Sequence, residues 1–596
     1  MHTLLLMVRV GLFFAWLLCG CVWLNRRFSL PAAHAPLVFI CGVSLAVYAA
    51  GLLNIIWPVQ LALYLAPPVL AARHVWREKW QALRPLVSLS MALFLAAAAA
   101  TLLAERGRVI DNHDELAHWA IAAKTVITTG RLPNMADTAV QFVDYPPAAT
   151  LWIKAVCGLT GFSDGSMLFA QSFLFLAAVL AFAPLCQKRW YAGAAVLGYA
   201  VYMACLSVAY RELRVDGMLT MLMAAVWAIT AALRKEPRRA LAASLPVLCF
   251  LAILKNSGLF FVALGAIPLM ALAARNKPHG WKNAGLAALP LAGPLFTWWL
   301  WQAHVALVFV DADVSKHAAS LTAYAGQLAG KTPEDIAAFW EKFRGFWLFI
   351  SDPPVMRLYA CTAVFLVTVL ALAVLGWMRW RVAAGYAAAW VAATAAYVAA
   401  LAGTYLFSMN TDEMLAIASI RRYAASYFEC LPAAAIVLAL VYLEPALTAP
   451  ARLGGILPKG ARPWQALAVS LALAAFGFGF AAAHGRPANL LYSARAAATT
   501  ARQNYWLELK EEYGLPEGES CLLYVNGMNV DSWHEGYVVR YVFNSGEVVF
   551  TSELSEELAR QYDFLVVCAR DEGSRAFLES LGLDPNAVLV DLRHQW

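Results

Sequence analysis

The stretch Asp111–Ala120, DNHDELAHWA, places three carboxylates close behind an apolar run that ends at Glu105. One acid is enough to cap a helix. Capping by Asp111, with Asp114 and Glu115 favouring the positive end of the helix dipole, therefore accounts for only part of the pattern. Carboxylates at a membrane surface are partly desolvated, which raises a carboxyl pKa toward the range useful for accepting a proton. We interpret these three acids as candidates for a catalytic general base.

The same stretch contains two histidines, but their spacing does not fit a common zinc motif. His113 and His118 are five residues apart, whereas HExxH places its histidines four apart on one helix face. Asp114 and His118 are four apart, so they could share a proton or a cation. Acids and histidines allow a divalent metal without specifying one, so metal ligands stay unknown.

Further ionisable residues lie in short polar connections along the chain. The VDYPP turn holds Asp144 and Tyr145 before an amphipathic segment that its prolines would begin as a helix. The other candidates are Arg211 and Asp216 in YRELRVDGML, Lys255 in ILKNSGLFF, Lys316 and His317 in DADVSKHAAS, and Arg421, Arg422 and Tyr423 in IASIRRYAAS. A lone cation at a membrane surface is usually a headgroup anchor. Several cations that alternate with acids favour a phosphate site, because arginine grips phosphate bidentately and lysine acts as a point charge.

The chain that carries these residues has the composition of a membrane protein. Of its 596 residues, 62% are hydrophobic and 14% charged, against roughly 25% charged in soluble domains. Apolar runs near the ~20 residues that cross hydrocarbon recur to about Ala483. We predict an all-α polytopic membrane protein with about fourteen transmembrane helices. They centre on 3–24, 36–55, 57–72, 85–104, 164–184, 190–208, 217–233, 240–254, 258–274, 283–303, 356–377, 382–405, 427–444 and 464–483.

Basic residues predict how these helices are oriented. Alternate connections carry clusters such as Arg26-Arg27, Lys188-Arg189 and Arg379/Arg381, as the positive-inside rule expects of cytoplasmic loops. The candidate site residues lie in the opposite connections. We therefore expect them on the periplasmic or extracellular face of a multi-pass plasma (inner) membrane protein.

The chain after about Thr500 has a different character. It carries 17 acidic and 7 basic residues, a net of −10, which leaves +17 on the remainder. Strands are expected at CLLYV, FLVVC and AVLVDL and helices at SELSEELARQ and EGSRAFLESL, whereas GYVVRYVFNSGEVVF fits either a hairpin or a helix followed by a strand. We predict a helix from about Leu491 to Tyr513 and a small extracytoplasmic α/β domain, in which Cys521 and Cys568 could form a disulfide.

These motifs resemble the GT-C superfamily of polytopic glycosyltransferases, which includes protein O-mannosyltransferases and lipid A aminoarabinose transferases. Asp114-Glu115 looks like the acidic pair of that family's first large outer loop, and Tyr145-Pro146-Pro147 looks like a later element of the same loop. The other parallels are Arg211 with Asp216, Lys255 before a glycine-led span, and the late pair Arg422-Tyr423. The resemblance covers roughly 85–440. We expect three parts along the chain: N-terminal helices at 1–84, a GT-C-like catalytic region at 85–483 with outer loops 105–163 and 304–355, and a periplasmic α/β domain at 484–596. The last of these has no obvious counterpart in the family and is predicted from the residue pattern alone.

The resemblance implies an inverting glycosyltransferase. It would move a monosaccharide from a polyprenyl-phosphate carrier to a hydroxyl of a glycan, lipid or protein acceptor at the periplasmic face. Asp114 would be the base, with Glu115 orienting the acceptor or a metal and Asp111 as an alternative base. The substrate-binding residues would be His118, Asp144, Tyr145, Arg211, Asp216, Lys255, Lys316, His317, Arg421, Arg422 and Tyr423. No cofactor is expected apart from an optional divalent metal. No nucleic acid partner is expected either.

Three other functions stay open at this point. An O-antigen-type ligase or polymerase would use a lipid-linked oligosaccharide and concentrate arginines in one large late outer loop, a character that 311–344 partly shares. A secondary transporter would place its ionisable residues near the bilayer midplane, between related halves. A noncatalytic membrane receptor would tolerate the loss of Asp114.

Overall fold

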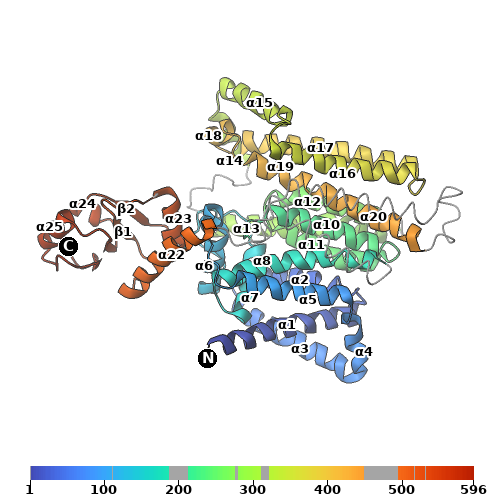
Figure 1. Cartoon of the computed structure of the whole chain (residues 1–596), viewed down its shortest axis with the longest axis horizontal. Coiled ribbons are helices and arrows are strands. Elements are labelled where there is room, and N and C mark those ends of the chain that lie inside the picture. Colours follow the sequence, from blue (N-terminus) through green and yellow to red (C-terminus); the bar gives the residue numbers. More distant parts are fainter. Residues whose placement is uncertain are drawn as a thin grey trace.

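The computed structural model describes residues 2–110, 112–186, 212–274, 280–309, 321–448, 494–515, 517–530 and 532–596. A bundle of helices carries a small sheet domain at one end (Figure 1). The first helices are α1 (His2–Phe28), α2 (Ala35–Leu52), α3 (Ile56–Glu78), α4 (Trp80–Leu83), η1 (Arg84–Leu86), α5 (Leu89–Glu105), η2 (Glu115–Ala120), α6 (Ile121–Thr129), α7 (Ala148–Thr160), α8 (Asp164–Leu180) and η3 (Ala183–Leu185). They are followed by α10 (Asp216–Ala232), α11 (Pro237–Ala252), α12 (Gly258–Ala274), α13 (Gly280–Val308), α14 (Leu321–Ala329), α15 (Pro333–Leu348), α16 (Pro353–Val374), α17 (Trp380–Phe407), α18 (Thr411–Leu415), α19 (Ile420–Phe428) and α20 (Cys430–Thr448).

The described helices make a multi-pass membrane protein. Seven are long and apolar enough to cross a bilayer, and the bent pair Trp80–Leu86 and Leu89–Glu105 would make an eighth. Three shorter apolar helices, α7, α10 and α12, lie among them. The count of about fourteen spans stays a prediction, and two of its members, 190–208 and 464–483, lie outside the described residues.

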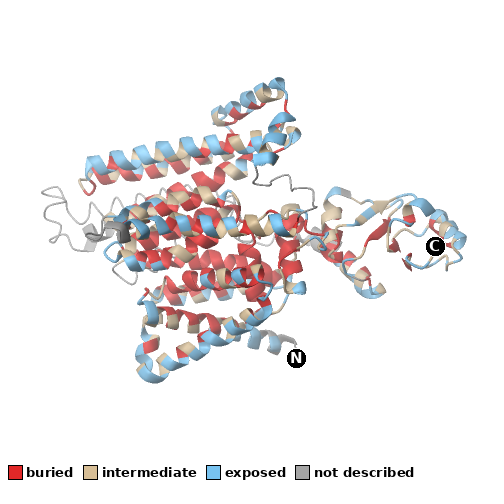
Figure 2. Cartoon of the chain, turned by 180° about the vertical axis from the view of Figure 1, so that it is seen from behind, coloured by how far each residue is buried: buried red, intermediate tan, exposed pale blue. Residues whose placement is uncertain are grey.

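Burial divides the apolar helices into two kinds. Helix α8 is buried from Gly165 to Leu180, whereas α17 is exposed along most of its length although it is equally rich in apolar residues (Figure 2). An apolar helix that is not covered by protein needs another apolar environment. The exposed faces of α16 and α17 therefore form a lipid-facing edge of the bundle.

Basic turns gather at the end of the bundle away from the sheet domain. Arg26 near the end of α1 forms an ion pair with Glu78 at the end of α3, with 3.1 Å between Nε and Oε2. Figure 1 places α4 and the turn between α16 and α17, which holds Arg379, at this same end. The described part of the acidic stretch, which leads into α6, lies toward the opposite end, beside the sheet domain.

The C-terminal part is the small α/β domain expected from the sequence. Strands β1 (Cys521–Tyr524), β2 (Val548–Thr551), β3 (Phe564–Val567) and β4 (Leu589–Asp591) form one sheet in the order β2-β1-β3-β4. Strand β1 pairs in parallel with β2 and β3, and β4 runs antiparallel to β3. The helices are α22 (Ala494–Tyr513), α23 (Ser532–Phe543), α24 (Glu556–Ala559) and α25 (Glu572–Ser580). The ambiguous segment is thus a helix, α23, followed by strand β2.

The sheet register keeps the two cysteines of this domain apart. Cys521 and Cys568 are both free. Cys521 is the register partner of Phe564, so Cys568 lies four residues further along, about 13 Å at ~3.3 Å per residue. A disulfide requires Cα atoms within about 7 Å. The bridge considered from the sequence is therefore not formed.

Candidate active site

The acidic stretch begins a helix whose first full turn is π-helical. Asn112 caps it: its Oδ1 accepts a hydrogen bond from Asp114 N at 2.9 Å, and its carbonyl accepts from Glu115 N at 3.0 Å. The π-helical turn η2 continues directly into α6, and such turns recur at functional sites. The sequence suggested an ordinary helix with Asp111 as its N-cap, but Asp111 lies outside the described residues.

Asp114 belongs to an alternating set of charges contributed by distant segments. Arg422 of α19 forms an ion pair with Asp114 Oδ2, and its Nε lies 3.8 Å from Asp216 Oδ2. Lys255 Nζ donates a hydrogen bond to Asp216 Oδ1 at 2.8 Å. The set therefore joins two carboxylates to two cations, and this mutual pairing offsets the cost of desolvating them.

Lys255 lies in a tight turn between α11 and α12. This turn brings its side chain to Asp216, the first residue of α10. Gly258 begins α12 and donates its N–H to Lys255 O at 2.8 Å. A Cβ at Gly258 would lie 2.3 Å from the Leu251 carbonyl oxygen, a distance that real side chains do not adopt. Only glycine allows the turn to pass so close to α11.

Consecutive residues of α19 have different surroundings. The Tyr423 ring lies beside both cations of the set, with its centroid 5.1 Å from Lys255 Nζ and 5.2 Å from Arg422 Cζ. This geometry favours cation–π attraction. Arg421, in contrast, is 63% exposed and pairs with Asp352 at 2.9 Å, so it is not brought to the charged set.

An inner layer of aromatic and polar groups supports the charges. The His118 imidazole contacts the edge of the Tyr145 ring at 4.3 Å between centroids. Asn256 Nδ2 donates to Asp144 Oδ2 at 3.5 Å, and Trp301 Nε1 donates to Asp144 O at 2.9 Å. Burial raises the pKa of Tyr145 well above its ordinary value, so this hydroxyl stays protonated and able to donate.

Glu115 is buried and fixes the polar segment that leads into α10. Its Oε1 accepts a hydrogen bond from Leu213 N. Beside this contact, Arg214 Nε donates to Glu212 Oε2 at 2.5 Å. Glu115 thus ties η2 to the backbone that positions Asp216, a structural use that the sequence alone did not indicate.

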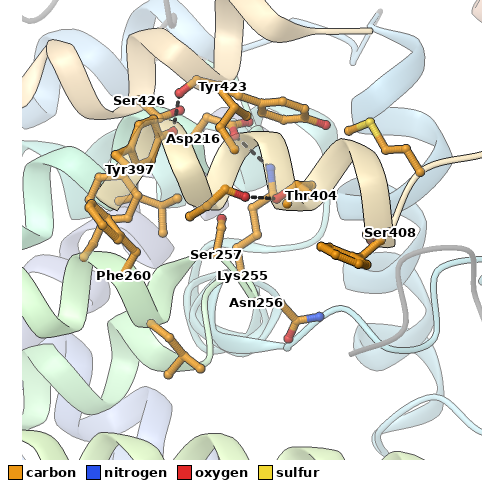
Figure 3. Close-up of a pocket in the computed structure, with 18 of the residues that line it drawn as sticks. Asp216, Lys255, Asn256, Ser257, Phe260, Tyr397, Thr404, Ser408, Tyr423 and Ser426 are labelled. Atoms are coloured by element: carbon orange, nitrogen blue, oxygen red, sulfur yellow. Dashed lines mark hydrogen bonds and ion pairs between the residues drawn. The ribbon is translucent and has the colours of Figure 1, made fainter. Parts of the chain in front are cut away.

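Two members of the charged set, Asp216 and Lys255, line a cavity of about 560 Å³ between α12, α17 and α19. Figure 3 shows Lys255 and Asp216 joined by a hydrogen bond at this cavity, with Tyr423 near them. The rest of the lining is mostly apolar and includes Phe260, Phe261, Trp298, Tyr397, Leu401 and Phe407. A cavity with Lys255 in its lining, Arg422 beside the lining residue Asp216, and apolar walls elsewhere suits an amphiphile with an anionic head.

Four of the predicted site residues, Asp111, Arg211, Lys316 and His317, lie outside the described residues. Sequence reasoning also missed Asn256, whose Oδ1 accepts from Trp298 Nε1 at 3.1 Å while its Nδ2 faces Asp144. Its position next to Lys255 in LKNSG was the available signal. The aromatic wall on α17 had no such signal, because its residues resemble those of any apolar span.

The described part of the chain holds no group of three His, Cys, Asp or Glu side chains placed to bind a metal ion. The two carboxylates of the charged set, Asp114 and Asp216, are paired with Arg422 and Lys255 instead. We therefore derive no chemical step through a metal.

No family model and no curated protein matches the chain. Among solved structures, the chain is similar to the crystal structure of ArnT from Cupriavidus metallidurans bound to undecaprenyl phosphate. The TM-score is 0.44 and the sequence identity 12%, over 84% of this chain and 98% of that chain.

Proposed function

We propose that the protein is an inverting glycosyltransferase that uses a polyprenyl-phosphate-linked monosaccharide as donor. The observation that carries the proposal is the Asp114–Arg422–Asp216–Lys255 set at the edge of the apolar cavity. The set offers a carboxylate for an acceptor hydroxyl and two cations for a phosphate.

On the donor side, the phosphate would lie against Lys255 and Arg422. Arginine can grip two phosphate oxygens through its planar fork, and lysine adds a point charge. The isoprenoid chain would occupy the cavity beside Phe260 and Tyr397. One wall is α17, at the lipid-facing edge of the bundle, so a long chain would continue from there into the bilayer.

On the acceptor side, Asp114 would act as the general base. Its side chain is 31% exposed, so a hydroxyl can reach it, unlike Asp216 at 2%. Asp114 takes the acceptor proton, the acceptor oxygen forms a bond to the anomeric carbon, and the bond from that carbon to the phosphate oxygen breaks. The leaving phosphate keeps the electron pair, and Arg422 and Lys255 stabilise the charge that develops on it.

The proposal places this chemistry on the periplasmic face. The basic turns with Arg26 and Arg379 lie at the other end of the bundle, where the positive-inside rule expects the cytoplasm. No nucleotide motif is present in the sequence. A lipid carrier would supply the activated sugar, so the protein would need no nucleotide-binding site.

The test is a transfer assay with purified full-length protein, radiolabelled polyprenyl-phosphate sugars and a crude envelope fraction as acceptor. We expect Asp114→Asn to fold normally and to lose transfer. Asp412→Asn, at an exposed position of α18, is the carboxyl-to-amide control that should keep transfer. Loss of transfer in Asp111→Asn alone would identify Asp111 as the base. Full activity in both Asp111→Asn and Asp114→Asn would contradict the carboxylate mechanism.

A further inference from the structure

Helix α23 of the C-terminal domain is anchored on the helix that continues from the acidic stretch. Lys124 of α6 donates hydrogen bonds to the carbonyl oxygens of Tyr541 and Val542 at 2.8 and 3.0 Å. The Tyr541 hydroxyl donates to Asp164 Oδ1 at 2.5 Å. Lys124 and Tyr541 are both buried, so the C-terminal end of α23 is held firmly against the membrane part.

The other end of α23 then reaches the candidate base. The Trp533 indole lies 4.6 Å from the His113 imidazole between centroids, and His113 Nε2 lies 3.5 Å from Asp114 Oδ1. Tyr537, one turn along α23, contacts the indole edge-on at 5.6 Å. Trp533 is nevertheless 58% exposed. An indole supported on one side and open on another is available to a ligand.

The two oxygens of Asp114 face different partners. Oδ2 pairs with Arg422, on the side of the cavity and the proposed phosphate, whereas Oδ1 faces His113 and, beyond it, Trp533. A donor that fills the Arg422 side leaves the His113 side as the approach for the second substrate. The acceptor must therefore pass Trp533 to bring a hydroxyl to Asp114.

We infer that Trp533 and His113 form the acceptor subsite and that this subsite takes a sugar ring. An exposed indole offers a flat apolar surface that can cover the C–H face of a pyranose, while a polar group at its edge serves the hydroxyls. His113 supplies that polar group. Burial lowers the pKa of His113, and His534, Arg214 and Arg422 lower it further against the opposing effect of Asp114. The imidazole is thus neutral at pH 7 and can donate at one nitrogen and accept at the other.

This inference rests on the proposed transferase function and names the acceptor class for it. An exposed tryptophan in a membrane protein is otherwise an anchor at the lipid headgroups. Replacing a headgroup anchor would change the KM values for donor and acceptor alike, or neither KM when the enzyme is in detergent. Replacing a residue of the acceptor subsite would change the KM for the acceptor alone.

The experiment uses full-length enzyme in detergent, a polyprenyl-phosphate sugar as donor, and p-nitrophenyl pyranosides as acceptors beside n-octanol and N-acetylserine amide. We expect Trp533→Ala to raise the KM for the pyranosides about tenfold. The donor KM should stay unchanged, and Trp533→Tyr should recover most of the affinity. The control is Trp596→Ala, because Trp596 is 44% exposed in the same domain and lies over Arg560, with the guanidinium carbon 4.8 Å from its ring centroid.

Several results would overturn the inference while leaving the transferase function standing. One is an unchanged pyranoside KM in Trp533→Ala; another is an equal rise in the donor KM. A wild type that transfers to the envelope fraction or the ring-free alcohols but not to pyranosides would also exclude a sugar subsite. A wild type that transfers to no acceptor at all, the envelope fraction included, would overturn the transferase function and this inference together.

Discussion

Arg422 forms an ion pair with Asp114, a residue 308 positions earlier in the chain, and the same guanidinium lies 3.8 Å from Asp216. The candidate base is therefore neutralised by the cation that the proposed donor phosphate would need. Arg422 Nε and Asp216 Oδ2 have no hydrogen-bond partner among the described residues. Under the proposed function, an incoming phosphate would accept from Arg422 and in doing so release Asp114 for the acceptor hydroxyl.

This exchange predicts ordered binding with the donor first. We expect product-inhibition patterns of an ordered mechanism, because Asp114, although accessible at Oδ1, would act as a base only after the phosphate has drawn Arg422 away from Oδ2. Arg422→Lys should lower kcat/KM for the donor by about 10- to 100-fold, since lysine lacks the planar fork. Arg421→Lys is the matched control, because Arg421 pairs with Asp352 outside the site. Random-order kinetics would contradict the exchange.

Lys255 and Asp216 should depend on each other for stability. Their side chains are only 11% and 2% exposed, so Lys255→Met leaves a buried carboxylate without its closest partner. We expect a loss of about 3–5 kcal/mol in unfolding free energy. The double variant Lys255→Met/Asp216→Asn should recover most of that stability and still transfer no sugar. The measurements are denaturant unfolding in detergent and the transfer assay, and a double variant with normal transfer would remove both residues from the chemistry.

Filling the cavity should weaken donor binding without touching a charged group. Gly403 of α17 lines the cavity, and a Cβ placed there meets only Phe407 Cδ2, at 3.8 Å. Gly403→Leu should therefore fold and raise the donor KM, whereas the acceptor KM stays near wild type. Gly385→Leu on the same helix is the control, since nothing lies within 4 Å of a Cβ at that position. Equal effects of the two variants would indicate a general effect of leucine on α17.

Docking of the C-terminal domain should strengthen at alkaline pH. Burial lowers the pKa of Lys124 to about 8, with the charge of Glu517 acting in the opposite direction. A lysine in the unfolded chain keeps its proton to about pH 10.4. Folding therefore releases this proton between about pH 8 and pH 10, and the contribution of Lys124 to stability rises with pH across that window.

The measurement is the unfolding free energy of the wild type minus that of Lys124→Met at pH 7.5, 8.5 and 9.5. We expect the difference to grow in favour of the wild type by up to about 1.4 kcal/mol per pH unit. The subtraction cancels the contributions to the unfolding free energy from groups that titrate in both proteins. A difference that is flat or falls with pH would show that Lys124 is not desolvated at this contact.

Local sequence determined most of the secondary structure of this protein and several of its candidate site residues. Apolar length and sparse charge predict the membrane helices, and short apolar runs predict β1, β3 and β4, because burial and backbone preference act within a few residues. The Asp114-Glu115 pair and Lys255 also stand out locally, since ionised groups beside apolar spans are costly without a use.

Only the tertiary structure decided which of these groups meet. Arg421 and Arg422 are adjacent in the sequence, yet an α-helix turns by about 100° per residue, so Arg422 reaches Asp114 while Arg421 pairs with Asp352. Asp114 and Glu115 differ in the same way, because Glu115 accepts from Leu213 N inside the protein. Which face of a helix meets a partner hundreds of residues away depends on how whole helices pack, and a local pattern carries no record of that packing.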